Sequence, residues 1–191
     1  MNPKEELLNN LLNKYNNCQD CGLHKFKTTN QLNAGDTNAD LLIVSDYPNY
    51  SMSFISDKIT EFRSIMPNSL FFITYALCGK PPDEREPLFE EEILKCNKRL
   101  FYTIYLIRPK IIVALGSVAA KALLPELKLP LKDHIGQPLK FDISDLSSIL
   151  YITYHPKYLD KAPSNRLITD LHWAEIKGML KCSITSRDKK E

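Results

Sequence analysis

Short, strongly apolar runs alternate along the chain with longer stretches in which apolar residues recur at helical spacing. A short run of aliphatic, β-branched and aromatic residues is typical of a buried strand, whereas apolar positions three and four residues apart indicate an amphipathic helix. The apolar runs predict four strands, at 41–44, 70–77, 111–116 and 149–154. The helical spacing predicts helices at 3–16, 54–66, 89–107, 118–124 and from 164 or 165 onward.

This alternation of strands and helices predicts the fold class. Strands that alternate with helices usually form a parallel sheet with helices on both faces. We therefore expect an α/β, three-layer sandwich with a central, mainly parallel four-stranded sheet. No repeat or low-complexity segment divides the chain, so 1–191 is expected to form a single domain. Three segments are expected to lack regular structure: the proline-rich 79–87, the loop-rich 125–148 and a frayed tail at 183–191.

The fourth strand ends in His155, which is followed by Pro156. Proline cannot donate a hydrogen bond to a sheet and holds the preceding residue in an extended conformation. His155 is therefore expected at the carboxyl end of a strand, which is the edge where open α/β sheets bind ligands. Taken alone, this stretch is equally consistent with a capped histidine of the core.

Composition and charge exclude only a few classes of protein. Hydrophobic residues make up 43% and charged residues 25% of the chain, as in an ordinary globular protein. The net charge of +2 identifies no partner, so a nucleic-acid surface would have to be a local basic patch. The sequence has no run of 18 apolar residues, and its charged start lacks the apolar core of a signal peptide. We therefore expect a cytoplasmic protein that does not contact membranes.

Four of the five cysteines are candidate metal ligands. Cys18 and Cys21 form a Cys-x2-Cys pair, Cys78 closes the second predicted strand, and Cys96 lies on the helix that follows. In a reducing compartment such cysteines are more often metal ligands or reactive thiols than disulfides. The spacing alone leaves an iron–sulfur centre, a zinc site and no metal open, because the second pair is not a second Cys-x2-Cys.

Six sequence blocks, in this order, resemble the iron–sulfur uracil-DNA glycosylases, which are family 4 of the uracil-DNA glycosylase superfamily. They are Cys-x2-Cys-x-Leu from residue 18, Val-Ser-Asp-Tyr-Pro-Asn from 44, Phe-Ile-Thr-Tyr-Ala-Leu-Cys-Gly-Lys-Pro-Pro from 72, Glu-Glu-Ile-Leu-Lys-Cys from 91, Arg-Pro-Lys-Ile-Ile-Val-Ala-Leu-Gly-Ser-Val-Ala from 108 and Thr-Tyr-His-Pro-Lys-Tyr-Leu from 153. The resemblance implies the fold of that superfamily, base excision from DNA, and a [4Fe–4S] cluster. It assigns the cluster to Cys18, Cys21, Cys78 and Cys96, and it leaves Cys182 outside the pattern.

The chain differs from this family in the residues with which the family recognises the flipped base. Ser-Asp-Tyr-Pro-Asn at 45–49 replaces the family's Gly-Glu-Ala-Pro-Gly, so a carboxylate is kept in shortened form. The family's phenylalanine segment has no counterpart between Asn49 and Leu70, although Tyr50 or Phe54 could substitute for it. The family's uracil-reading asparagine falls at Tyr75, which could stack on a base or simply fill the pocket. The expected substrate-binding residues are therefore Ser45, Tyr47, Asn49, Phe54 and Tyr75.

Two residues are candidates for catalysis. Breaking a glycosidic bond leaves an anionic base and a cationic sugar. His155 is expected to stabilise the departing base, and Asp46 to stabilise the sugar or to orient water. Aspartate is also a common turn residue, which is the alternative role for Asp46. Phosphate contacts are expected from Lys157, Lys161 and Arg85, each of which could instead be an ordinary solvated cation.

Together these features predict a monofunctional DNA glycosylase whose choice of base is altered. Loss of both the uracil reader and the stacking segment predicts a bulkier modified pyrimidine as substrate, and hence a role in defence against phage with modified DNA. The alternatives are ordinary uracil excision in repair and an inactive module that binds DNA or protein. The partner is expected to be DNA, single- or double-stranded, bound by a monomer.

Overall fold

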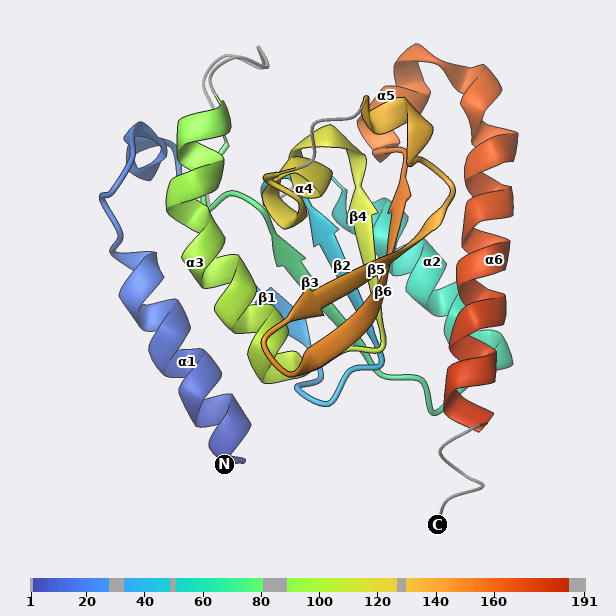
Figure 1. The fold of residues 1–191 in the computed structure, drawn as a ribbon, viewed down its shortest axis with the longest axis horizontal. Helices are drawn as coiled ribbons and strands as arrows, with labels where there is room; N and C mark the ends of the chain where they lie inside the picture. The colour runs from blue at the N-terminus through green and yellow to red at the C-terminus, as the bar shows by residue number, and fades with distance from the viewer. Residues whose placement is uncertain (1, 28–32, 49–50, 81–88, 127–129, 186–191) are drawn as a thin grey trace.

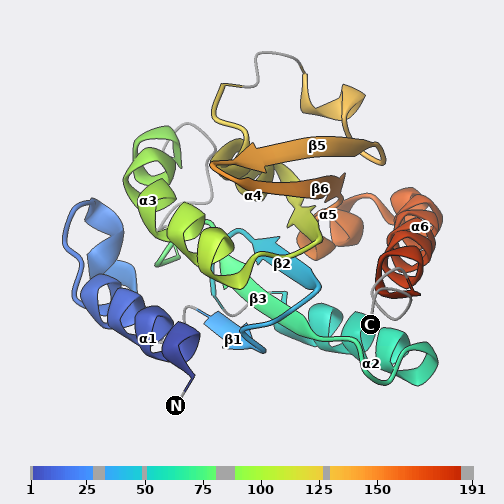
Figure 2. The same cartoon turned by 60° about the horizontal axis from the view of Figure 1, so that its bottom comes forward.

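The computed structural model describes residues 2–27, 33–48, 51–80, 89–126 and 130–185 of the chain. A mixed sheet lies at its centre, with the strand order β1-β3-β2-β4-β6-β5 (Figures 1 and 2). The strands are β1 (Asn33–Gly35), β2 (Leu41–Ser45), β3 (Phe71–Tyr75), β4 (Ile111–Leu115), β5 (Pro138–Ile143) and β6 (Leu146–Thr153). The four inner strands are parallel, and the two edge strands are antiparallel to their neighbours.

Helices cover both faces of the sheet (Figure 1). The α-helices are α1 (Pro3–Asn16), α2 (Met52–Ile65), α3 (Phe89–Ile107), α4 (Gly116–Leu123), α5 (Pro156–Lys161) and α6 (Arg166–Thr185). The short 3₁₀ helices of the described residues are η1 (Gly22–Phe26), η3 (Leu131–Asp133) and η4 (Pro163–Asn165). None of the helices in the described part of the chain is both long and apolar enough to cross a membrane.

Alternation along each strand divides the core into two layers. Leu42 and Val44 of β2 pack with α1, α3 and α4, whereas Leu41 and Ile43 of the same strand pack with α2 and α6. Successive side chains of a strand point to opposite faces, so a strand buried on both faces is a continuous apolar run. The predicted three-layer α/β sandwich with a mainly parallel central sheet is therefore confirmed.

The prediction of four strands was incomplete. Segment 125–148 was expected to be a loop, but it contains η3 and β5, and β5 pairs along its length with β6. Its alternation of Leu139, Phe141 and Ile143 with polar residues is a strand signal that the expected loop overlooked. The three residues of β1 carry no such signal, because a segment this short gains its strand geometry from pairing with β3.

The helices near the two ends of the chain differ in how well their bounds agree with the prediction. Helix α1 has the predicted bounds: Asn2 accepts a hydrogen bond from the N–H of Lys4, and the Glu5 side chain accepts one from the N–H of Asn2. The tail was expected to fray from residue 183, but α6 continues through Thr185. Residues 186–191 lie outside the described part of the chain.

Candidate functional site

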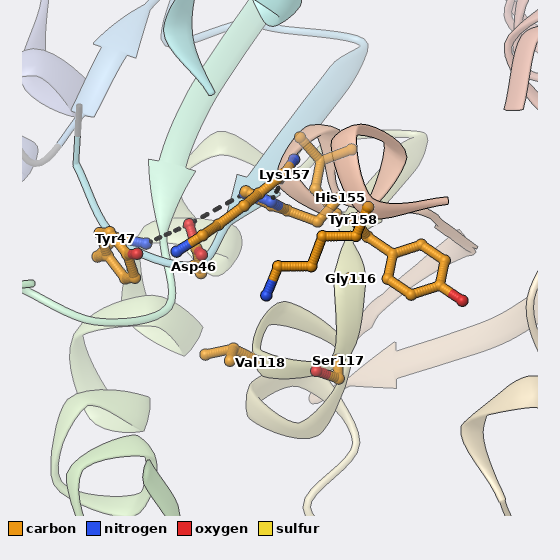
Figure 3. Close-up of a pocket in the computed structure, with 10 residues that line it drawn as sticks. Asp46, Tyr47, Gly116, Ser117, Val118, His155, Lys157 and Tyr158 are labelled. Atoms are coloured by element: carbon orange, nitrogen blue, oxygen red, sulfur yellow. Dashed lines mark hydrogen bonds and ion pairs between the residues drawn. The ribbon is translucent and has the colours of Figure 1, made fainter. Parts of the chain in front are cut away.

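A cavity of about 230 Å³ opens at the carboxyl ends of β2, β4 and β6 (Figure 3). Parallel strands place their carboxyl ends on the same edge of the sheet, so residues far apart in sequence meet there. The lining residues are Asp46, Tyr47, Leu115, Gly116, Ser117, Val118, His155, Lys157, Tyr158 and Lys161. The cavity therefore brings together five predicted site residues: Asp46, Tyr47, His155, Lys157 and Lys161.

Asp46 and His155 are in direct contact. Oδ1 of Asp46 lies 3.2 Å from Nε2 of His155, and both side chains are largely buried. The same carboxylate oxygen accepts a hydrogen bond from the backbone N–H of Tyr47 over 2.8 Å and another from the hydroxyl of Ser45 over 3.2 Å. These donors hold the carboxylate toward the imidazole, so Asp46 does more than form the turn after β2.

The other ring nitrogen of His155 establishes where its hydrogen lies. His155 is the N-cap of α5, and its Nδ1 accepts a hydrogen bond from the backbone N–H of Lys157 over 3.2 Å. An N–H group can only donate, so Nδ1 carries no hydrogen and the neutral imidazole carries it on Nε2. The nitrogen nearest Asp46 is therefore a donor.

Gly116 makes room for this histidine. It follows β4 with φ +80°, and a Cβ atom on it would lie 2.7 Å from Cβ of His155. Both the backbone conformation and the available space favour glycine here. The predicted sites did not include Gly116, although a glycine at the turn from a strand into a helix is a feature of ligand-binding sheet edges.

Ser45 lies behind the site rather than on its surface. Its side chain is completely buried, and its hydroxyl lies 2.6 Å from the hydroxyl of Ser51 and 3.4 Å from Nε2 of His155. It does not line the cavity. Ser45 is thus placed to orient the Asp46–His155 pair, and Ser51, which was not among the predicted residues, extends the same network.

Tyr75 and Phe54 do not line the cavity. Tyr75 is buried, and its hydroxyl donates to Sδ of Met52 over 2.9 Å. Burial, and to a smaller extent the charge of Asp46, raise the pKa of the Tyr75 hydroxyl. Phe54 packs edge-on against Trp173 with ring centroids 6.1 Å apart, beside a second cavity of about 420 Å³ between α2, α5 and α6. Two further predicted residues, Asn49 and Arg85, lie outside the described residues.

The four candidate metal ligands lie around one apolar cluster. Cys78 and Cys96 are buried with their sulfur atoms 3.9 Å apart, and Cys18 and Cys21 pack against the same cluster. A hydrogen bond from the Cys96 thiol lowers the pKa of Cys78, whereas burial raises the pKa of Cys18 and Cys21. Thiols are the donors that iron–sulfur clusters and zinc prefer, so the donor chemistry fits such a centre. Within the described residues, however, no three or more candidate ligands are grouped closely enough to hold a metal ion.

Arg99 connects the four cysteines, which we call the thiol cluster, to the sheet. Its side chain is completely buried; Nη1 donates to Oγ1 of Thr74 over 3.1 Å, and Nη2 donates to the backbone carbonyl of Tyr75. The positive charge of Arg99 also contributes to lowering the pKa of Cys78. Nε of Arg99 has no hydrogen-bond partner. A buried cation is costly unless negative charge lies nearby, which favours a thiolate at Cys78.

Comparison with known proteins agrees with this arrangement. The sequence profile of the uracil DNA glycosylase superfamily matches residues 3–177. A type-4 uracil-DNA glycosylase of Pyrobaculum aerophilum is 29% identical over 163 residues, which cover 78% of this chain and 83% of the relative. A type-4 uracil-DNA glycosylase of Archaeoglobus fulgidus is 27% identical, over 61% of this chain and 63% of the relative. One of Sulfurisphaera tokodaii is 24% identical, over 85% of this chain and 80% of the relative. The chain belongs to the uracil-DNA glycosylase superfamily, and these relatives confirm its resemblance to family 4.

Proposed function

We propose that this DNA glycosylase flips a pyrimidine nucleotide into the cavity beside Asp46 and His155 and hydrolyses its N-glycosidic bond. The observation that carries the proposal is the contact between Asp46 and the Nε2–H of His155 at the carboxyl ends of β2 and β6. A base inside a duplex cannot be reached by such a pair, so the nucleotide must leave the stack first.

His155 is assigned to the departing base. When the bond between C1′ and N1 breaks, its electron pair stays with the base and negative charge develops on the pyrimidine O2. When the nucleotide is bound, the Nε2–H donates to that oxygen in place of Oδ1 of Asp46, while the N–H of Lys157 still donates to Nδ1 and holds the ring. A preorganised donor of this kind loses little energy in reorganisation, so it stabilises the transition state more than the ground state.

Asp46 is assigned to the sugar. The carboxylate stabilises positive charge at C1′ and orients the water whose oxygen forms the new bond to C1′. The water loses one proton and the departing base gains one, so the products are a free base and an abasic sugar. The hydrogen bonds from Ser45 and Tyr47 hold the carboxylate in place for this role.

The preferred base is proposed to be a modified pyrimidine bulkier than uracil. The support is the resemblance itself: Tyr75 stands where the family has its uracil-reading asparagine, and the segment with the stacking phenylalanine has no counterpart. Tyrosine offers one hydroxyl where asparagine offers a donor and an acceptor, and this hydroxyl is directed to Met52. Modified pyrimidines occur in some phage genomes, so defence is the corresponding role. The names of the relatives favour uracil itself as the second candidate.

A [4Fe–4S] cluster is proposed to be held by Cys18, Cys21, Cys78 and Cys96. Its support is the resemblance to family 4 together with the packing of all four cysteines on one cluster of the core. Such a centre would attach the segment after α1 to α3 and β3, and its role here is structural. Excision itself is assigned to Asp46 and His155.

A panel of DNA substrates tests this function. Oligonucleotides, single-stranded and paired, carry uracil, thymine opposite guanine, or a hydroxymethylated or glycosylated pyrimidine, and abasic sites are detected by alkaline cleavage. We expect the modified pyrimidines to be released faster than uracil, and the His155→Ala variant to release little of either. Fastest release of uracil would establish the second candidate. Release of no base, with salt-dependent DNA binding retained, would establish a DNA-binding module.

A further inference from the structure

Three aromatic rings form a continuous stack between the core and the rim of the cavity. His172 of α6 stacks on Tyr154 with ring centroids 6.0 Å apart and an interplanar angle of 23°. Tyr154 in turn stacks on Tyr158 of α5, with centroids 5.4 Å apart and an angle of 16°. The order along the stack is therefore His172, Tyr154, Tyr158, and the last ring is the one that lines the cavity.

The inner end of the stack is firmly held. His172 is buried, its Nδ1 lies 3.0 Å from the hydroxyl of Thr153, and its ring meets the edge of Tyr151. The outer end is open, because Tyr158 is 47% exposed although one face of its ring is covered by Tyr154. An aromatic ring that is rigid on one side and exposed on the other can accept a flat partner without first being ordered.

The surroundings of Tyr158 indicate what that partner is. Lys157 and Lys161 line the same cavity as Tyr158, and the ring lies on the side of the cavity away from Asp46 (Figure 3). An exposed ring that shares a cavity with two lysines resembles the stacking platforms of single-strand-binding proteins, in which lysines contact phosphates and rings stack on bases. A purely apolar protein partner would not be favoured beside two ammonium groups.

We propose that Tyr158 is a stacking platform for the nucleobase next to the flipped nucleotide, and that this contact favours single-stranded DNA. The inference rests on the proposed function, because it takes the cavity to be where the flipped nucleotide enters. A ring that offers its face needs a base whose own face is uncovered. A single strand supplies such a base with little loss of stacking or pairing, whereas a duplex must be opened first.

The experiment measures binding of a thymidine oligonucleotide by fluorescence anisotropy, with the strand alone and paired with its complement. Stacking of one base on an aromatic ring is typically equivalent to about 5- to 150-fold in affinity, so Tyr158→Ala should weaken single-strand binding within that range. Tyr158→Phe keeps the ring and should bind as the wild type does. The matched control is Tyr102→Ala on α3, because Tyr102 is 59% exposed but lines no part of this cavity; its affinity should not change.

Salt dependence and strand form separate stacking from other causes. Stacking releases no counterions, so Tyr158→Ala should leave the slope of log K against log salt concentration unchanged. Paired DNA should lose less affinity than the single strand. An unchanged single-strand affinity in Tyr158→Ala overturns the proposal, and so does a loss that Tyr158→Phe fails to restore or an equal loss on paired DNA. The thymidine strand contains no base that needs to be excised, so these outcomes are independent of whether excision is observed.

Discussion

The backbone N–H of Lys157 donates a hydrogen bond to Nδ1 of His155 over 3.2 Å. This contact assigns the hydrogen of the neutral ring to Nε2, the nitrogen that faces Asp46 at 3.2 Å. Proline at 156 supports the arrangement, because it suits the first position of α5 and leaves His155 in the extended conformation of an N-cap. The turn from β6 into α5 thus orients the side chain to which we assign stabilisation of the departing base.

Removing the imidazole should affect the reaction far more than the binding of DNA. We expect His155→Ala to slow single-turnover excision by about 10²–10³-fold, the usual effect of deleting one preorganised donor. Affinity should change little, since it depends mainly on phosphate contacts. Lys157→Ala should do the reverse, weakening binding and its salt dependence while the backbone N–H stays in place. Full activity of His155→Ala on the best substrate would make His155 a structural residue.

Gly116 should be needed for the position of His155. A methyl group at Gly116 would meet Cβ of His155 at 2.7 Å, in a backbone conformation that disfavours L-residues by about 1–2 kcal/mol. Gly116→Ala should therefore slow excision and lower the free energy of unfolding. The control is Gly178→Ala on the exposed side of α6, where nothing lies within 4 Å; it should stabilise the protein by about 0.5–1 kcal/mol. Equal activity of the two variants would show that His155 tolerates the added methyl group.

Tyr75 should limit the excision of uracil. Asparagine can pair with the edge of uracil, and an unmatched polar pair in a buried pocket costs about 1–3 kcal/mol. Tyr75 is buried and does not line the cavity, so Tyr75→Asn should raise the rate of uracil excision in a single-turnover assay if the shorter side chain opens that space to the base. Tyr75→Phe removes only the hydroxyl that donates to Met52, so it should leave that rate unchanged. No gain in Tyr75→Asn would show that other parts of the site determine the choice of base.

The thiol cluster should give the purified protein a colour. With four thiolates around an iron–sulfur cluster, we expect a brown protein with broad visible absorbance. Cys78→Ala should lose the bound iron, the colour and much of its solubility, because the centre would no longer attach the N-terminal segment to the sheet. Cys182→Ala removes an exposed cysteine and should keep all three. A colourless wild type with one bound zinc ion would replace the cluster with a zinc site.

His172 should make stability depend on pH. Burial lowers the pKa of His172 below its usual 6.5, with the charge of Glu175 opposing the shift. The unfolded chain therefore protonates His172 more readily than the folded chain does. The contribution of neutral His172 to the free energy of unfolding is present above the pKa of the unfolded state, and it is lost as the pH falls through the pKa of the folded state. Denaturant unfolding measured from about pH 8 down to about pH 5 should show this loss, and His172→Gln should flatten it. Parallel curves for the two proteins would exclude His172 as the cause.

The sequence by itself determined the four inner strands and placed the two candidate catalytic residues at one edge of the sheet. Each inner strand is an apolar run of about the usual strand length. Parallel strands share one carboxyl edge, so Asp46 after β2 and His155 after β6 had to lie at the same edge. Neither conclusion required knowledge of any side-chain contact.

Only the tertiary structure decided how the side chains at that edge are directed. Tyr75 and Phe54 pack against Met52 and Trp173 rather than lining the cavity, because helices remote in sequence fill the space around them. The hydrogen on Nε2 of His155 depends likewise on a backbone N–H two residues away, and that contact exists only because α5 begins there. Strand spacing determines where a residue lies in the sheet, but the neighbours that fill its surroundings determine what its side chain can reach.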